Sequence, residues 1–140
     1  MHIHGLQKLA MVDYPGKLAA TVFTGGCNLR CPFCHNALLV TRLAETPEIP
    51  EQEVLDFLAS RRGLLDGVVL TGGEPLLFPD FKTLYRRLRN LGMILTINTN
   101  GTLLDEAYAD FFATYPPRRI NITLYGADAA SYDRLCHFPQ

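Results

Sequence analysis

The sequence predicts an α/β fold in which about four parallel strands follow an N-terminal hairpin. Segments typical of strands alternate with segments typical of helices, and each of these strands ends in a turn of small residues. The chain has 140 residues. Since a complete eight-unit barrel takes about 250 residues, or roughly 30 per unit, this length suits about four units. We therefore expect residues 1–140 to form one domain of about four strand–helix units, and the abrupt C-terminal end suggests a truncated form of a longer chain.

The predicted elements can be justified in order along the chain. They are a strand over 18–24, a short apolar segment over 37–43, a helix over 51–62, a strand over 67–70, a helix from Pro79 to Gly92, a strand over 93–98, a helix over 106–114, a strand over 119–124 and a short last helix. The first strand belongs to a hairpin, because apolar segments flank the turn-forming sequence Asp13-Tyr14-Pro15-Gly16. Pro50 suits the first turn of the helix over 51–62, and Gly63 suits its end.

The later elements repeat this alternation of strand and helix. The segment 67–70 is a short continuous apolar run, which is typical of a strand buried on both faces of a parallel sheet. Pro79 and Gly92 are residues that favour the start and the end of a helix. Asp105 and Asp128 are suited to cap the last two helices, since an aspartate side chain accepts hydrogen bonds from first-turn amide groups. The last strand would leave one unpaired edge, which predicts a homodimer or a partner that covers it.

The composition limits the classes of partner. With 48% hydrophobic residues, 19% charged residues and a net charge of −1, the chain offers no broad electrostatic reason to bind nucleic acid. No apolar run approaches the length of a membrane span, and the first residues lack the pattern of a signal peptide. We expect a soluble cytoplasmic protein without membrane contacts, in which reduced thiols favour a metal site over disulfides.

Three of the four cysteines lie in one loop, directly after the first strand of the parallel sheet. Cys27, Cys31 and Cys34 are separated by three and two residues, close enough to bind one inorganic centre. Ferredoxin sequences supply four cysteines to each cluster, whereas the fourth cysteine here, Cys136, is distant and is interpreted as a buried or terminal bystander. A four-iron cluster would therefore keep one iron without a cysteine. The alternative is a closed zinc site that adds His35. Zinc sites tend to use separated ligand pairs, and His35 directly follows a cysteine, so we favour the cluster.

The pattern Cys27-x3-Cys31-x-Phe33-Cys34 resembles the signature of the radical S-adenosylmethionine (SAM) superfamily. This resemblance implies a partial (β/α) barrel and a [4Fe–4S] cluster whose ligands are Cys27, Cys31 and Cys34. It also implies that the open iron binds SAM, which an electron from the cluster cleaves to methionine and a 5'-deoxyadenosyl radical. Phe33 would line the adenine side of the cofactor. No catalytic side chain is implied beyond the cluster and the cofactor.

A second motif follows the strand over 67–70. Gly72 and Gly73 allow the backbone to approach a ligand closely, and Glu74 can accept hydrogen bonds from an ammonium group. This Gly-Gly-Glu-Pro sequence resembles the superfamily motif that contacts the amino group of SAM. Asn98 and Asn100 lie at the end of the next strand, and Thr123 and Tyr125 lie at the end of the last strand. We expect these four side chains to meet the ribose or the carboxylate of the cofactor. The ends of parallel strands then form one ligand-facing rim.

The N-terminal half also resembles a narrower group. Over about residues 3–77 it is similar to activating proteins of glycyl radical enzymes, especially those of the anaerobic ribonucleotide reductase. The resemblance implies a glycyl radical enzyme as partner, hydrogen abstraction from a backbone glycine, and a flavodoxin- or ferredoxin-like electron donor. Residues 120–127 instead resemble radical enzymes that modify other peptides or small molecules. The alternatives are therefore a radical SAM enzyme with another substrate, or an inactive, truncated cluster-binding module.

Overall fold

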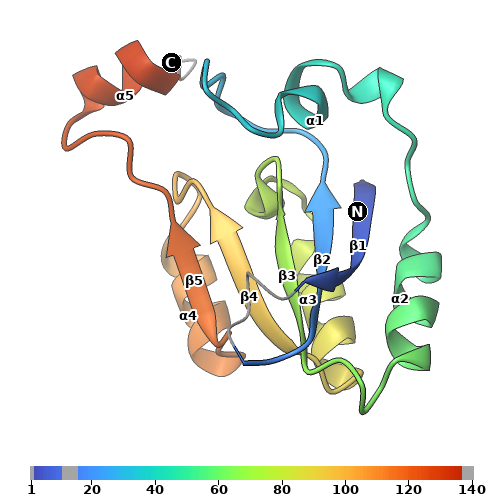
Figure 1. The fold of residues 1–140 in the computed structure, drawn as a ribbon. Coiled ribbons are helices and arrows are strands. Elements are labelled where there is room, and N and C mark those ends of the chain that lie inside the picture. The colour runs from blue at the N-terminus through green and yellow to red at the C-terminus, as the bar shows by residue number, and fades with distance from the viewer. Residues whose placement is uncertain (1, 11–15, 137–140) are drawn as a thin grey trace.

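A five-stranded sheet forms the centre of the structure, a computed structural model that describes residues 2–10 and 16–136 (Figure 1). In their order across the sheet, the strands are β1 Ile3–Ala10, β2 Ala19–Thr24, β3 Gly67–Gly72, β4 Ile94–Thr99 and β5 Arg119–Ile122. β1 runs antiparallel to β2, whereas the strands from β2 to β5 are parallel to one another. The prediction of a hairpin followed by four parallel strands is confirmed, although the expected turn at Asp13-Tyr14-Pro15 lies outside the described residues.

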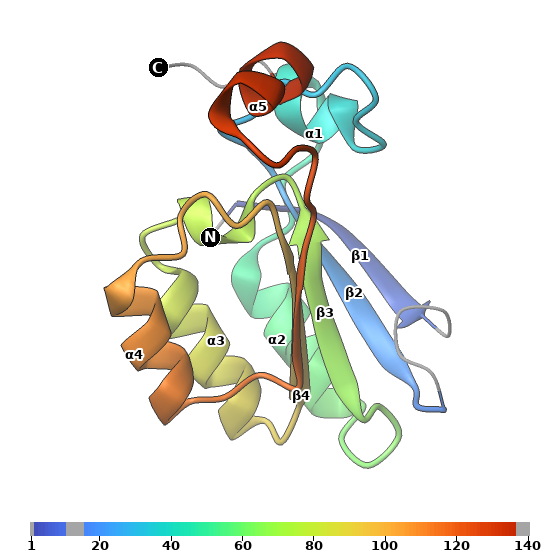
Figure 2. The same ribbon diagram turned by 90° about the vertical axis from the view of Figure 1, so that its left-hand side faces the viewer.

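The helices divide into two groups by position. They are α1 Ala37–Thr41, α2 Glu51–Ser60, α3 Phe81–Asn90, α4 Glu106–Thr114 and α5 Ala129–Cys136, with short 3-10 turns at Leu43–Glu45 and Pro75–Leu77. Figure 2 shows α2, α3 and α4 against one face of the sheet. In both views α1 and α5 lie beyond the ends of the strands, at the edge where the parallel strands terminate. Among the described residues, no helix is long and apolar enough to cross a membrane.

The main hydrophobic core lies between the sheet and the three covering helices. Val68 and Leu70 of β3 belong to it, together with Leu84 and Leu88 of α3, and all four side chains are fully or almost fully buried. Successive strand residues point to opposite faces, so these positions alternate with residues that face away from the helices. Burial of the apolar face holds the helices on one side only, as in the wall of a barrel.

The opposite face of the sheet carries small and polar residues. Val69 and Thr96 lie on this face, because each stands between two strand residues that point into the helix-covered core. Both side chains are buried. Two positions further along the same strands come Thr71 and Asn98, which therefore share this face. Both reach the edge at which the parallel strands end, where they line a cavity. Polar side chains on the face of the sheet opposite to the helices therefore extend to the candidate site.

Strand pairing explains why the ends of two strands differ from the prediction. β3 continues two residues beyond the expected end, because Thr71 and Gly72 pair with Phe23 and Thr24 of β2. β5 ends at Ile122, two residues early, because its partner β4 ends at the paired residue Thr99. α3 begins at Phe81 instead of Pro79. The sequence of one strand does not reveal how long its neighbour is.

Both predicted aspartate caps are confirmed. The amide of Tyr108 donates to Asp105 Oδ1 at 2.8 Å, and the amide of Ser131 donates to Asp128 Oδ1 at 2.8 Å. α4 covers residues 106–114, as predicted. Because each cap satisfies an amide group that has no partner within the helix, it contributes to helix stability.

Asp105→Ala should lower the free energy of unfolding by about 0.5–2 kcal/mol, since the capping hydrogen bond is lost. Asp110→Ala is the matched control, because Asp110 is an exposed aspartate within α4 instead of at its start. Urea denaturation of both variants measures the difference. Equal stability of the two variants would show that the cap contributes nothing.

Candidate cofactor site

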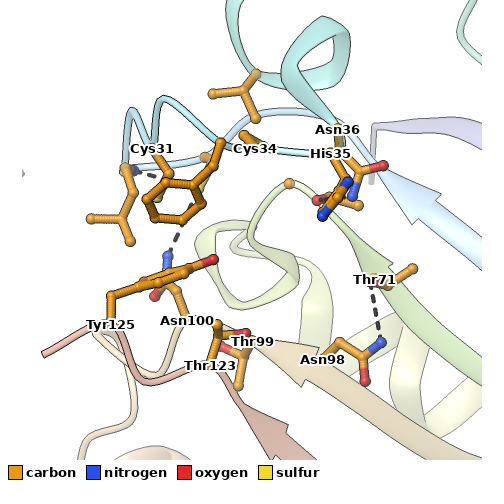
Figure 3. Close-up of a pocket in the computed structure, with 16 residues that line it drawn as sticks. Cys31, Cys34, His35, Asn36, Thr71, Asn98, Thr99, Asn100, Thr123 and Tyr125 are labelled. Carbon is orange, nitrogen blue, oxygen red and sulfur yellow. Dashed lines mark hydrogen bonds between the residues drawn. The ribbon is translucent and has the colours of Figure 1, made fainter. Parts of the chain in front are cut away.

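The candidate site is a cavity of about 400 Å³ at the C-terminal ends of the parallel strands (Figure 3). Its volume lies within the range of small-molecule sites. Residues from the cysteine loop and from the ends of β3, β4 and β5 line it. Ten of the predicted site residues are among them: Cys27, Cys31, Phe33, Cys34, Gly72, Gly73, Asn98, Asn100, Thr123 and Tyr125. Glu74 was also predicted, but it is not among the residues that line the cavity.

Backbone hydrogen bonds shape the cysteine loop. The amide of Gly26 donates to Leu39 O at 2.7 Å, and this glycine has a φ of 79°, a conformation that side-chain-bearing residues rarely adopt. Arg30 closes the loop on itself, because its guanidinium donates to Cys27 O at 2.6 Å. The amide of Arg30 also donates to Cys136 O at 2.7 Å, which ties the end of α5 to the loop. The cysteines therefore stand on a loop that is held at several points.

The three thiols are arranged more widely than in a single-ion site. A tetrahedral zinc ion with Zn–S bonds of about 2.3 Å would bring the sulfur atoms to about 3.8 Å from one another. The three sulfur atoms do not all lie within 4.8 Å of one another. Among the described residues, the group of possible ligand atoms that does meet this limit lies elsewhere in the chain and contains no cysteine. A cluster that offers a different iron atom to each sulfur suits this wider triangle better than zinc does.

Burial sets the protonation of two of these thiols. It raises the pKa of Cys27, although the Leu29 amide (3.4 Å) and the Asn100 side-chain amide (3.8 Å) donate to the sulfur. Burial also raises the pKa of Cys31 to about 11, and the neighbouring thiol of Cys136 adds to the effect. Without a metal these thiols are protonated at neutral pH, and metal binding must displace their protons. Cys136 is fully buried beside Cys31, so it is closer to the site than the sequence indicated.

Gly72 and Gly73 allow the end of β3 to touch the cysteine loop. A Cβ atom on Gly73 would lie 1.8 Å from Gly26 O, and one on Gly72 would lie 2.6 Å from the backbone of Thr24. Gly72 also has a φ of 112°. The expected close backbone approach is present, but its visible partner is the cysteine loop. Only glycine fits at both positions, because any side chain would force the two loops apart.

Glu74 lies beneath the rim instead of facing the cavity, which differs from the expected position of its carboxylate. It is fully buried, and its pKa is raised by this burial. Oε1 accepts from the Leu76 amide at 2.9 Å and from the Thr99 hydroxyl at 2.7 Å, while Oε2 accepts from the Asn100 amide at 2.7 Å. The carboxylate therefore joins the end of β3 to the end of β4 and holds Asn100 in position.

Both predicted asparagines face the cavity, and both are already hydrogen-bonded. The Asn100 side-chain amide donates to Asn28 Oδ1 at 2.8 Å in addition to the sulfur of Cys27. Asn98 donates to Thr71 Oγ1 at 3.3 Å (Figure 3), and it accepts from the side chain of Asn121 at 2.8 Å. These side chains are consequently fixed in orientation before any ligand binds.

Tyr125 and Asn36 also line the cavity, and of these two only Tyr125 was predicted from the sequence. The ring of Tyr125 lies 5.0 Å from that of Phe33, and together they form an aromatic wall on one side of the cavity. Asn36 donates from its side-chain amide to Gly72 O at 3.1 Å, which joins the cysteine loop to β3 a second time. The sequence signal for Asn36 is its place two residues after Cys34, but nothing in that spacing reveals the carbonyl it contacts.

Comparison with known families decides the assignment. Residues 21–139 match the model of the Radical SAM superfamily. The chain belongs to the radical SAM superfamily. Its cofactors are those of the superfamily, a [4Fe–4S] cluster and SAM. The three widely spaced thiols and the adjoining cavity fit this pair of groups.

Named relatives of this radical SAM chain have different activities. A protein of Methanocaldococcus jannaschii named as a candidate glycyl-radical enzyme activating enzyme is 36% identical, over 71% of this chain and 40% of that protein. The 7-carboxy-7-deazaguanine synthase of Halobacterium salinarum is 35% identical, over 88% of this chain and 58% of the relative. The pyruvate formate-lyase-activating enzyme of Staphylococcus aureus is 31% identical, over 77% and 45%. The radical SAM chain therefore spans between 40% and 58% of the length of these relatives.

Solved structures confirm the fold of the radical SAM chain. QueE from Escherichia coli superposes with a TM-score of 0.57 at 20% identity, over 72% of this chain and 52% of that one. SuiB from Streptococcus suis gives a TM-score of 0.57 at 25% identity, over 81% and 25%. The predicted α/β fold is thus confirmed, and its five-stranded, mostly parallel sheet is consistent with a partial barrel.

Glu74→Gln should lower the free energy of unfolding by about 1–3 kcal/mol, because the amide can replace only one of the two accepting oxygens and leaves a buried donor unpaired. It should also weaken SAM binding while leaving the iron content unchanged, since the Asn100 loop loses its anchor. Urea denaturation, SAM titration and iron analysis measure these effects. Glu53→Gln, at an exposed position of α2, is the control, with an expected change within about 0.5 kcal/mol. Unchanged stability and affinity of Glu74→Gln would refute the anchoring role.

Proposed function

We propose that this chain is the core of a radical SAM enzyme that activates a glycyl radical enzyme, most specifically the anaerobic ribonucleotide reductase. The observation that carries the proposal is the similarity to two relatives named as glycyl-radical or pyruvate formate-lyase-activating enzymes. The resemblance of residues 3–77 to reductase activators agrees with it. The partner's backbone glycine would lose its α-hydrogen to the 5'-deoxyadenosyl radical, which leaves 5'-deoxyadenosine and a glycyl radical.

In this proposal the cysteine loop holds the cluster. Cys27, Cys31 and Cys34 are its ligands, and when bound the cluster supplies the electron that cleaves SAM. The Leu29 amide and the Asn100 side chain point their N–H groups at the sulfur of Cys27. Hydrogen bonds to a ligating sulfur withdraw electron density, so these two groups tune the reduction potential.

The remaining cavity residues would position SAM. The backbone at Gly72 and Gly73 receives the amino group, and the fixed side chains of Asn98 and Asn100 meet the ribose or the carboxylate. Phe33, which is 46% exposed, lines the adenine side and shields it from water. Glu74 acts through Asn100, so it is a positioning residue in this proposal.

An open rim supports a macromolecular substrate. β5 is an edge strand, and Ile122 and Leu124 beside the cavity are 54% and 77% exposed. A peptide loop that carries the target glycine can approach a cavity bordered by such an edge. The same exposed edge is the basis for the predicted homodimer, since edge strands are usually covered.

A second candidate function is a radical SAM enzyme that acts on another peptide or small molecule. The observation that favours it is the 35% identity to a 7-carboxy-7-deazaguanine synthase, over a larger share of this chain than the activase relatives cover. Thr123 and Tyr125, which follow β5, line the cavity and would contact such a substrate. An inactive cluster-binding module is the third reading.

Cys31→Ala should abolish both iron loading and SAM cleavage after anaerobic reconstitution with iron and sulfide, because one iron corner loses its thiolate. Cys136→Ala is the matched control and should keep its iron. Iron and sulfide analysis, with chromatography of 5'-deoxyadenosine, measures both effects. Full iron content in Cys31→Ala, or loss of iron in the control, would show that the ligands are wrongly assigned.

The reconstituted protein, mixed with purified anaerobic ribonucleotide reductase, SAM and reduced flavodoxin, should produce a glycyl radical. Electron paramagnetic resonance detects that radical, and 5'-deoxyadenosine should form in equal amount. Formation of 5'-deoxyadenosine without a glycyl radical, on this reductase or on pyruvate formate-lyase, would favour another substrate. Absence of 5'-deoxyadenosine with an intact cluster would favour the inactive module.

A further inference from the structure

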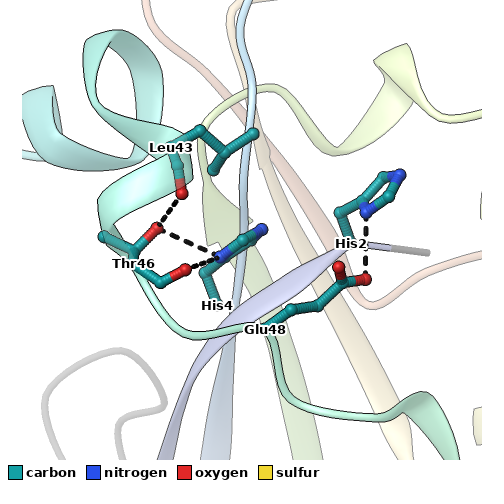
Figure 4. A network of polar contacts seen from close by, with 5 residues as sticks. All are labelled: His2, His4, Leu43, Thr46 and Glu48. Carbon is teal, nitrogen blue, oxygen red and sulfur yellow. Dashed lines mark hydrogen bonds and ion pairs between the residues drawn. The ribbon is translucent and has the colours of Figure 1, made fainter.

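A second group of metal-ligating side chains lies behind the cysteine loop, at the start of β1 (Figure 4). His2 and His4 flank Ile3, so they share one face of the strand. Glu48 reaches them because the amide of Ile49 donates to Ile3 O at 2.7 Å, in an antiparallel bridge between these residues. One ligand atom from each of the three side chains lies within 4.8 Å of the other two.

The hydrogen bonds of Thr46 determine which nitrogen of His4 carries the proton. The Thr46 hydroxyl donates its own proton to Leu43 O at 2.8 Å. Towards His4 Nδ1 the hydroxyl (3.1 Å) and the Thr46 carbonyl (3.2 Å) can therefore act only as acceptors. Nδ1 must carry the proton, and Nε2 keeps its lone pair. Histidine ligands of metal ions are held in this way, with the other ring nitrogen donating to a carbonyl.

The lone pair of His4 Nε2 has no partner. Nε2 is buried, and it makes no hydrogen bond with any of the described residues. Figure 4 shows Thr46 on one side of the His4 ring and the pair of His2 and Glu48 on the other. Buried polar atoms are almost always satisfied, and an exception calls for an absent ligand or another explanation.

His2 and Glu48 provide the other two ligand atoms. His2 Nδ1 lies 2.9 Å from Glu48 Oε1, and both side chains are half exposed or more. A cation can take the place of the proton between these two atoms if the neutral imidazole of His2 carries its hydrogen on Nε2. Water can accept a hydrogen bond from Nε2, because the His2 side chain is exposed. The carboxylate then supplies the negative charge that compensates a divalent ion.

We propose that His2 Nδ1, His4 Nε2 and a carboxylate oxygen of Glu48 bind one divalent transition-metal ion, for which Zn²⁺ is the best match. Two imidazoles and one carboxylate are a borderline ligand set that suits zinc, whereas Mg²⁺ and Ca²⁺ prefer oxygen ligands only. Three protein ligands leave the remaining position to water. This site is separate from the cysteine loop and does not depend on the proposed function.

The position of the site gives it a structural role. The amide of Gly25 donates to His2 O at 3.0 Å. The ring of His4 packs against Gly25, where an added Cβ would lie 2.5 Å from His4 Cδ2 and 2.3 Å from the side chain of Leu43. A bound ion would therefore join β1 to the connector at residues 46–49 and support the first residues of the cysteine loop from behind.

Zinc binding is tested on the full chain with its iron–sulfur cluster reconstituted, so that the cysteines are occupied. After dialysis against Zn²⁺, elemental analysis should find one zinc per chain in addition to the iron. X-ray absorption at the zinc edge should show nitrogen and oxygen neighbours without sulfur. Mg²⁺ at the same concentration should not displace the zinc, and zinc should raise the melting temperature.

Variants at the two exposed ligands make the test specific. His2→Ala and Glu48→Ala should each weaken zinc binding by about 100-fold or more, since loss of even an outer-shell partner costs about 10–100-fold. Both should keep their iron and lose the zinc-dependent rise in melting temperature. Glu53→Ala on α2 is the control and should bind zinc as the parent does. The proposal would be overturned if no zinc bound, if the bound zinc had sulfur neighbours, or if both variants bound zinc as tightly as the parent.

Discussion

The contact between two glycine turns at the ends of β2 and β3 is the constraint on which the site depends. The parallel register aligns Thr24 with Gly72, so the turns that follow leave the sheet side by side. Gly73 then passes Gly26 O so closely that no side chain fits between them. Two backbone hydrogen bonds seal the contact, from Gly73 N to Thr24 O and from Glu74 N to Gly26 O, both at 2.8 Å. The cysteine loop and the second motif therefore form one surface.

A buried carboxylate extends this surface to the next strand. Glu74 accepts hydrogen bonds at the end of β4, where Asn100 turns back towards Cys27. The predicted cofactor residues thus divide by task, since the glycines bring backbone to the cavity and the polar side chains hold the rim together. These groups are held in place before any ligand binds, which is the preorganisation that a binding site requires.

The hairpin that precedes the parallel strands supports the same loop from the other side. The carbonyl of His2 accepts a hydrogen bond from the Gly25 amide, and the ring of His4 fills the space that a Cβ on Gly25 would need, two residues before the first cysteine. At the end of α5, the carbonyl of Cys136 accepts a hydrogen bond from the amide of Arg30. The loop is therefore held by segments that are far apart in the sequence. The relatives of this chain are named for reactions on different substrates.

The sequence by itself determined the order of elements, both aspartate caps and the three cysteines of the cavity, because hydrophobic periodicity, capping residues and cysteine spacing are local signals. Only the tertiary structure decided that Glu74 is buried and that Asn36 holds Gly72 O. It likewise decided that Cys136 lies beside Cys31 and that His2, His4 and Glu48 converge. These features depend on strand register and on the meeting of distant segments, and no local pattern encodes which backbone group a side chain will face.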